Sequence, residues 1–69
     1  MSTFIKLGEK IEECKKHLFY NHNLTYDESH EYVKSTFEET GLKFGLFTYV
    51  DKEQIKQAIK YLQKNIIEA

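Results

Sequence analysis

Four residues are of the types that bind zinc, namely Cys14, His17, His22 and His30. Cys14 and His17 are three positions apart, so a helix would place them one turn from each other. Closed zinc sites usually take their ligands as tight pairs from two halves of a motif, whereas His22 and His30 are eight positions apart. Cys14 also belongs to an apolar series, where a free cysteine behaves as a small hydrophobe. We therefore predict no metal site and no cofactor.

The same residue types do not indicate catalysis. A nucleophilic pair of Cys14 and His17 would need an exposed thiolate in electropositive surroundings, and an apolar stripe offers the opposite. The adjacent carboxylates Glu12 and Glu13 would point about 100° apart on a helix, so they do not form an acid–base pair. The three glycines match no phosphate-binding loop. We predict that the protein is not an enzyme.

A row of lysines is the feature best suited to binding. Lys52, Lys56, Lys60 and Lys64 recur every four residues, and like charges at this spacing cost a helix a few tenths of a kcal/mol per pair. Tyr61 is expected beside this row, exposed and away from the apolar stripe. These five residues suit contact with phosphates and stacking on a base, or docking onto an acidic protein. The simpler alternative is a solubilising lysine face.

The overall charge gives no bulk attraction to nucleic acid or to an anionic membrane. Ten basic residues stand against eleven acidic ones, for a formal net charge of −1, and every basic residue is a lysine. The absence of arginine disfavours sequence-specific reading of DNA. No segment approaches the roughly 20 apolar residues that cross a bilayer, and the first residues lack the apolar run of a signal peptide. We expect a cytoplasmic protein without membrane contact.

Three amphipathic helices are predicted, over about residues 3–20, 25–40 and 51–67, so the expected fold class is mainly α. The apolar stripe of the first helix has spacings of three and four, and its members are Phe4, Leu7, Ile11, Cys14 and Leu18. The turn-forming run Asn21-His22-Asn23 follows it and ends the helix.

The second helix begins at a capping box. Thr25 and Glu28 are three positions apart, so each side chain can satisfy the other residue's free backbone N–H. Gly41 stands where a left-handed residue would end the helix, with Leu42 packing back onto Phe37. The buried stripe is expected to be Tyr26, His30, Val33 and Phe37.

The third helix has a similar start, with Asp51 as the cap and Gln54 at the reciprocal position. Val50 is expected to pack onto Ile55 before the cap. The buried stripe consists of Ile55, Ala58, Ile59, Leu62 and Ile66. At 100° per residue Ile67 points away from this stripe.

The segment 42–50 between the second and third helices is rich in aromatic and β-branched residues and is predicted to be extended or irregular. A strand here would have to pair with a copy of itself or with the sheet edge of a partner. Two short turns broken at Gly45, or a short helix within a helix-turn-helix, are the alternatives. Its large side chains are the predicted self-association or partner surface: Leu42, Phe44, Leu46, Phe47 and Tyr49.

The chain of 69 residues is long enough for one small helical domain, residues 1–69. A lone core of this size contributes about 3–5 kcal/mol unless a disulfide, a metal or oligomerisation adds to it. A single cysteine forms no internal disulfide, and the five Phe and five Tyr exceed what so small a core needs. The leading hypothesis is a non-enzymatic interaction or regulatory protein that acts as a homodimer or larger oligomer and contacts another protein. The alternative is nucleic-acid or nucleotide binding through the lysine row.

Overall fold

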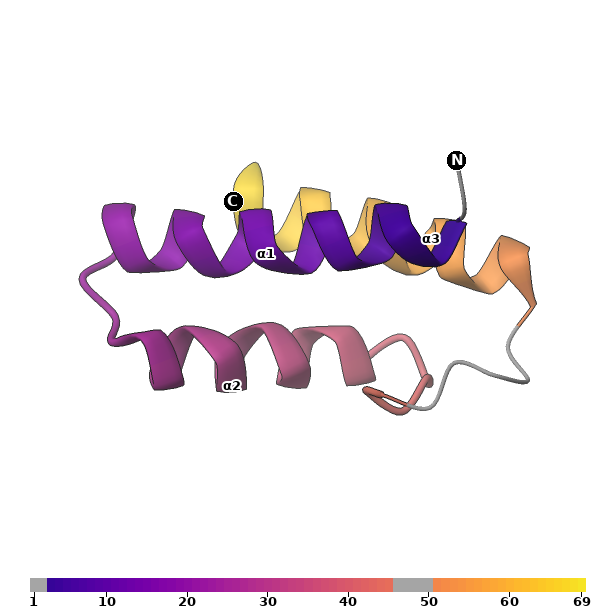
Figure 1. Ribbon diagram of the computed structural model, residues 1–69, viewed down its shortest axis with the longest axis horizontal. Helices are drawn as coiled ribbons and strands as arrows, with labels where there is room; N and C mark the ends of the chain where they lie inside the picture. The colour runs from indigo at the N-terminus through magenta and orange to yellow at the C-terminus, as the bar shows by residue number, and fades with distance from the viewer. Residues whose placement is uncertain (1–2, 46–50) are drawn as a thin grey trace.

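The computed structural model describes residues 3–45 and 51–69 and confirms a mainly α fold of three helices (Figure 1). The helices are α1 (Thr3–Asn21), α2 (Tyr26–Glu38) and α3 (Lys52–Leu62), and a π-helical turn, η1 (Gln63–Ile67), continues α3. None of the described residues is in a β-strand. The predicted third helix is therefore α-helical only as far as Leu62.

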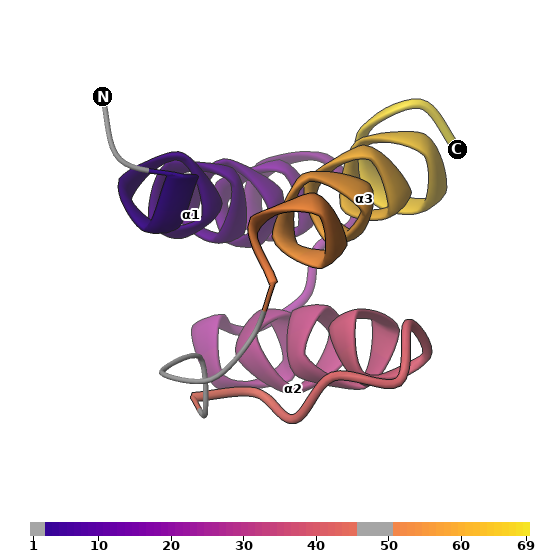
Figure 2. The ribbon, with the colours of Figure 1, turned by 90° about the vertical axis from the view of Figure 1, so that its right-hand side faces the viewer.

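The three helices form two layers. α1 and α3 lie side by side in one layer, and α2 packs beneath them (Figure 2). α1 and α3 run in the same direction, and α2 runs opposite to both (Figure 1). This arrangement leaves the side of the α1–α3 layer that faces away from α2 without a covering helix.

The buried stripe of α1 matches the predicted spacing, except at its first member. Leu7, Ile11, Cys14 and Leu18 are buried, but the side chain of Phe4 is 40 % exposed. Phe4 lies in the first turn of α1, at the end of the bundle, so its place in the stripe does not bury it fully. The predicted turn after the helix is present, with Asn23 in the left-handed region at φ 56°.

The capping box of α2 is confirmed. The backbone N–H of Glu28 donates to Oγ1 of Thr25 at 3.1 Å, and the backbone N–H of Thr25 donates to Oε1 of Glu28 at 2.9 Å. The predicted burial of Tyr26 is wrong, because its side chain is 51 % exposed. Ser29 and Thr36 are buried instead, and each hydroxyl donates to a carbonyl of its own helix turn. A pattern of apolar residues at helical spacing does not predict the burial of such hydroxyl residues.

Gly41 has the predicted left-handed conformation, but α2 ends earlier than predicted, at Glu38 with Glu39 as its C-cap. Gly41 has φ 90°, a conformation that costs a residue with a side chain but not glycine. Leu42 and Phe44 then fold back and pack, partly buried, against the core. The ring of Phe44 lies 5.8 Å from the ring of Phe37 and 5.5 Å from that of the partly buried His30. The first part of the segment 42–50 is thus irregular, and residues 46–50 lie outside the described residues.

The start of α3 carries the second predicted capping box, formed by Asp51 and Gln54. Val50, the proposed partner of Ile55, is outside the described part of the chain. The prediction that Ile67 points away from the core is wrong, because Ile67 is partly buried against it. The π turn explains this difference: the backbone N–H of Glu68 donates to the carbonyl of Gln63, five residues earlier, so the residues of this turn rotate less than α-helical ones.

One hydrophobic core joins the helices. Its buried members are Leu7, Ile11, Cys14, Leu18, Val33, Phe37, Ile55, Ala58, Leu62 and Ile66. The only aromatic side chain among them is Phe37. Across residues 3–45 and 51–69, no helix has both the length and the apolar character to cross a membrane.

Candidate functional site

The four lysines of the predicted row are all exposed along α3 and η1: Lys52, Lys56, Lys60 and Lys64. Lys56 is close to Glu53, with 3.3 Å between Nζ and Oε1. Within the described residues, the other three form no ion pair. Most of the positive charge of this row is therefore not neutralised within the chain.

Two lysines of α1 join this row across the helix interface. One hollow is lined by Thr3, Lys6, Lys56, Ile59 and Lys60. A second hollow is lined by Lys10, Ile59, Lys60, Gln63, Lys64 and Glu68. Ile59 and Lys60 line both hollows, so the two are neighbours along the contact of α1 with α3 and η1, and we call them together the α1–α3 groove. Its lysines are Lys6, Lys10, Lys56, Lys60 and Lys64. No residue of α2 lines it.

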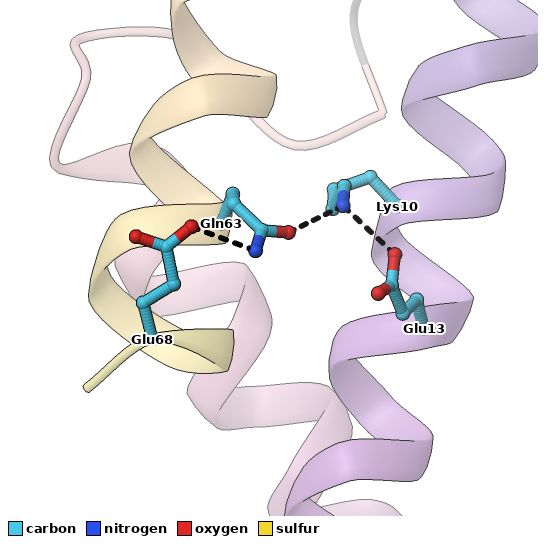
Figure 3. A network of polar contacts seen from close by, with 4 residues as sticks. All are labelled: Lys10, Glu13, Gln63 and Glu68. Atoms are coloured by element: carbon cyan, nitrogen blue, oxygen red, sulfur yellow. Dashed lines mark hydrogen bonds and ion pairs between the residues drawn. The ribbon is translucent and has the colours of Figure 1, made fainter.

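Sequence reasoning missed the contribution of Lys6 and Lys10, since nothing local links them to residues about 50 positions later in the chain. For Lys10 the link is a polar network with Glu13, Gln63 and Glu68 (Figure 3). Nζ of Lys10 donates to Oε1 of Gln63 at 2.6 Å and to Oε1 of Glu13 at 2.8 Å. Nε2 of Gln63 in turn donates to Oε2 of Glu68 at 2.9 Å. Lys10 is held in place by these contacts.

Tyr61 does not lie exposed beside the lysines, as the sequence suggested. It is partly buried, and its hydroxyl donates to Oε1 of Glu39 at 2.6 Å. This hydrogen bond raises the pKa of the phenol, with a smaller effect of desolvation. Tyr61 lines another hollow, together with Thr40, Leu42, Gln54 and Gln57. The structure thus separates Tyr61 from the α1–α3 groove.

The predicted association surface of the segment 42–50 is only partly described. Leu42 and Phe44 turn inward against the core, so neither presents a fully exposed face to a partner. Leu46, Phe47 and Tyr49 lie outside the described residues.

Exposed aromatic side chains gather instead where α1 meets α2. Phe19, Tyr20 and Tyr26 are 41, 75 and 51 % exposed. The ring of Phe19 lies 5.1 Å from that of Tyr20 and 6.3 Å from that of Tyr26, in both cases roughly edge to face. Lys15 and Glu12 hold Tyr26 in place, because Nζ of Lys15 lies 5.9 Å from the ring centroid and the tyrosine hydroxyl donates to Oε2 of Glu12 at 3.2 Å. We call Phe19, Tyr20 and Tyr26 the aromatic cluster.

Sequence reasoning missed the aromatic cluster because it placed Tyr26 in the buried stripe and gave Phe19 and Tyr20 no role. The adjacency of two aromatic residues outside the stripe of α1 was the only local signal.

The outer side of α2 is acidic. Its exposed carboxylates are Asp27, Glu28, Glu31 and Glu38, and its one basic residue, Lys34, is partly buried. The backbone N–H of Thr25 donates to Glu28 and lowers the pKa of that carboxyl. None of the ion pairs among the described residues involves α2. The molecule therefore has a basic groove in one layer and an acidic helix in the other.

The possible zinc ligands are spread over the fold. Cys14 is buried, and burial raises the pKa of its thiol to about 11. The rings of His17 and His22 lie 5.3 Å apart. In the described part of the chain, no three His, Cys, Asp or Glu side chains come together in a way that could hold a metal ion.

Comparison of the chain with protein-family models, with curated proteins and with solved structures gives no significant match.

Proposed function

We propose that the protein is a small non-enzymatic interaction protein, of a regulatory or inhibitory kind, that acts as a homo-oligomer in the cytoplasm. The observation that carries this proposal is the exposure of its aromatic side chains. Five of the eight aromatic residues that the structure describes are exposed: Phe4, Phe19, Tyr20, Tyr26 and Tyr32. Aromatic side chains are enriched at protein interfaces relative to the rest of the surface.

The arrangement of these side chains adds support. In the aromatic cluster, rings from α1 and α2 contact each other, so they present one continuous apolar area rather than isolated groups. Burying an exposed aromatic side chain in a contact removes apolar surface from water, worth about 25 cal/mol per Å². Among the residues that the structure describes, ten form the buried core, so association would also add to the stability of the fold.

The test is the mass of the protein in solution as a function of its concentration. Sedimentation equilibrium at low salt should show a mass above that of one chain at micromolar concentrations, and the Tm should rise with concentration. A monomer mass at every concentration, with a Tm that does not change, would contradict the proposal.

A second candidate function is nucleic-acid or nucleotide binding, and the convergence of lysines from two helices in the α1–α3 groove favours it. The hydrogen bond of Tyr61 to Glu39 counts against base stacking, so only phosphate contacts would remain. Titration of a fluorescently labelled oligonucleotide tests this candidate. Binding should weaken steeply as salt rises, and should be lost in Lys56→Glu/Lys60→Glu.

A further inference from the structure

We propose that the α1–α3 groove binds the acidic outer face of α2 from a second copy of this chain, so that copies associate head to tail. This inference rests on the proposed self-association and names the two surfaces that form it. It uses the groove residues Lys6, Lys10, Lys56, Lys60 and Lys64 and the α2 residues Glu28, Glu31 and Glu38.

The groove has an excess of positive charge that the chain itself does not balance. Lys6, Lys60 and Lys64 form no ion pair with any described residue. Glu13 is near Lys10 and Glu53 is near Lys56, while Glu68 lines one end of the groove. Bringing a negative surface into the groove would therefore relieve repulsion among lysines that now lie along two facing walls.

The shape of the groove fits a helix. The residues that line it come from two helices that run in the same direction, and they include Ile59, which is partly buried and apolar. A helix that lies between two others fills such a groove in helix bundles and in helix-in-groove complexes. α2 lies on the opposite side of this layer (Figure 2), and no residue of α2 lines the groove.

The outer face of α2 has the matching charge and length. Glu28, Glu31, Ser35 and Glu38 are exposed and are spaced three, four and three apart, so they form one stripe opposite the buried Val33. From Glu28 to Glu38 this stripe spans about 15 Å, and the groove lysines from Lys56 to Lys64 span about 12 Å. Tyr32, 49 % exposed, flanks the stripe and offers an aromatic contact for the apolar floor.

The positions of the two surfaces set the mode of association. The groove and the acidic stripe lie in opposite layers of the molecule, so one copy can use both at the same time. Its own α2 cannot reach its own groove. A contact between two different surfaces is heterologous, and it produces a ring or an open chain of copies rather than a closed two-fold dimer.

A nucleic acid is the other occupant that the charge would allow. Two observations count against nucleic acid: the chain has no arginine to make bidentate contacts with phosphates, and Tyr61 is hydrogen-bonded to Glu39. The acidic helix is favoured because α2 already provides a negative helical surface of the right length. The net charge of −1 also gives no overall attraction to a polyanion.

Charge reversal on each surface tests the proposal, with sedimentation equilibrium of the full chain at about 20 mM salt as the readout. Lys60→Glu and Glu31→Lys should each weaken self-association at least about tenfold. The double variant Lys60→Glu/Glu31→Lys should recover most of it, because the reversed charges face each other again. The matched control is Lys16→Glu, which makes the same charge change on α1 outside the groove and should leave association unchanged. Raising the salt to about 500 mM should weaken the wild-type association.

The outcomes separate this inference from the broader proposal. Wild-type protein that associates regardless of salt, Lys60→Glu and Glu31→Lys overturns the head-to-tail contact but leaves self-association standing. Wild-type protein that is monomeric throughout overturns both. A monomer that binds a labelled single-stranded oligonucleotide, and loses this binding in Lys60→Glu, would assign the groove to nucleic acid and overturn the inference. Circular dichroism of each variant checks that the helices remain folded, and recovery in the double variant excludes misfolding as the cause.

Discussion

Nζ of Lys10 donates a 2.6 Å hydrogen bond to Oε1 of Gln63, and this contact joins α1 to η1 across 53 positions of the chain. The same ammonium group lies 2.8 Å from Oε1 of Glu13, so one lysine ties the wall of the groove to the C-terminal turn. The side chain of Lys10 is only 19 % exposed, and its contact with Gln63 is partly buried, whereas Glu13 is 53 % exposed.

We expect Lys10→Met to lower the free energy of unfolding by about 1 kcal/mol, because it keeps the apolar stem and removes the hydrogen bond and the ion pair. The measurement is the urea unfolding midpoint at a fixed protein concentration. Lys16→Met, at an exposed position of the same helix, is the matched control and should change stability by less than about 0.5 kcal/mol. Equal effects of the two substitutions would show that the contacts of Lys10 add nothing to the free energy of unfolding.

Replacing glycine with alanine should stabilise the protein at one position and destabilise it at another. Gly8 lies inside α1, and an added Cβ would meet no atom within 4 Å, so Gly8→Ala should stabilise the protein by about 0.5–1 kcal/mol. Gly41 has φ 90°, so Gly41→Ala should destabilise it by about 1 kcal/mol or more. The Tm of each variant, measured by thermal unfolding, tests this prediction. A rise in Tm for Gly41→Ala would contradict the left-handed conformation of Gly41.

Cys14 should react with thiol reagents only when the protein unfolds. Burial raises the pKa of this thiol from its ordinary 9.0 to about 11, so the folded protein keeps the thiol protonated near neutral pH. The labelling rate with a disulfide reagent should therefore follow the fraction unfolded as urea is increased. Rapid labelling in the absence of urea would show that the packing of the helices around Cys14 opens readily.

The same thiol should make the protein less stable at alkaline pH. Because its pKa is raised in the fold, its contribution to stability is present in full below about pH 9 and is lost as the pH rises toward about 11. Urea midpoints measured between pH 7 and the alkaline range test this, with Cys14→Ala as the comparison. The variant should lose stability less steeply over this interval than the wild-type protein does.

The bond between Tyr61 and Glu39 should be visible in the ionisation of the phenol. Glu39→Ala removes the acceptor, so the pKa of Tyr61 should fall toward its ordinary value of 10.0. Because the hydrogen bond favours the protonated phenol, the contribution of Tyr61 to stability is present below pH 10.0 and is lost above it. Ring chemical shifts of Tyr61 as a function of pH measure the change. An unchanged titration in Glu39→Ala would show that this hydrogen bond does not form in solution.

Much of the fold could be predicted because the signals for it are local. Both capping boxes join residues three positions apart, Thr25 with Glu28 and Asp51 with Gln54, so each can be read from a few residues at the start of a helix. The glycine stop at Gly41 and most of the apolar stripes also follow from conformational preference and from helical periodicity over a few turns. Phe4, Tyr26 and Ile67 differ from the predictions because their burial depends on the end of the bundle, on buried hydroxyl residues in α2 and on the π turn.

The candidate site could be predicted only in part. The spacing of Lys56, Lys60 and Lys64 was visible in the sequence, but the α1–α3 groove also needs Lys6 and Lys10, which only the packing of α1 on α3 brings close. The same packing directs Tyr61 to Glu39, across 22 positions of the chain. The amino-acid sequence by itself thus determined the three helices, since their signals act over one or two turns. Only the tertiary structure decided which charged and aromatic side chains meet, because those contacts depend on how whole helices lie against one another.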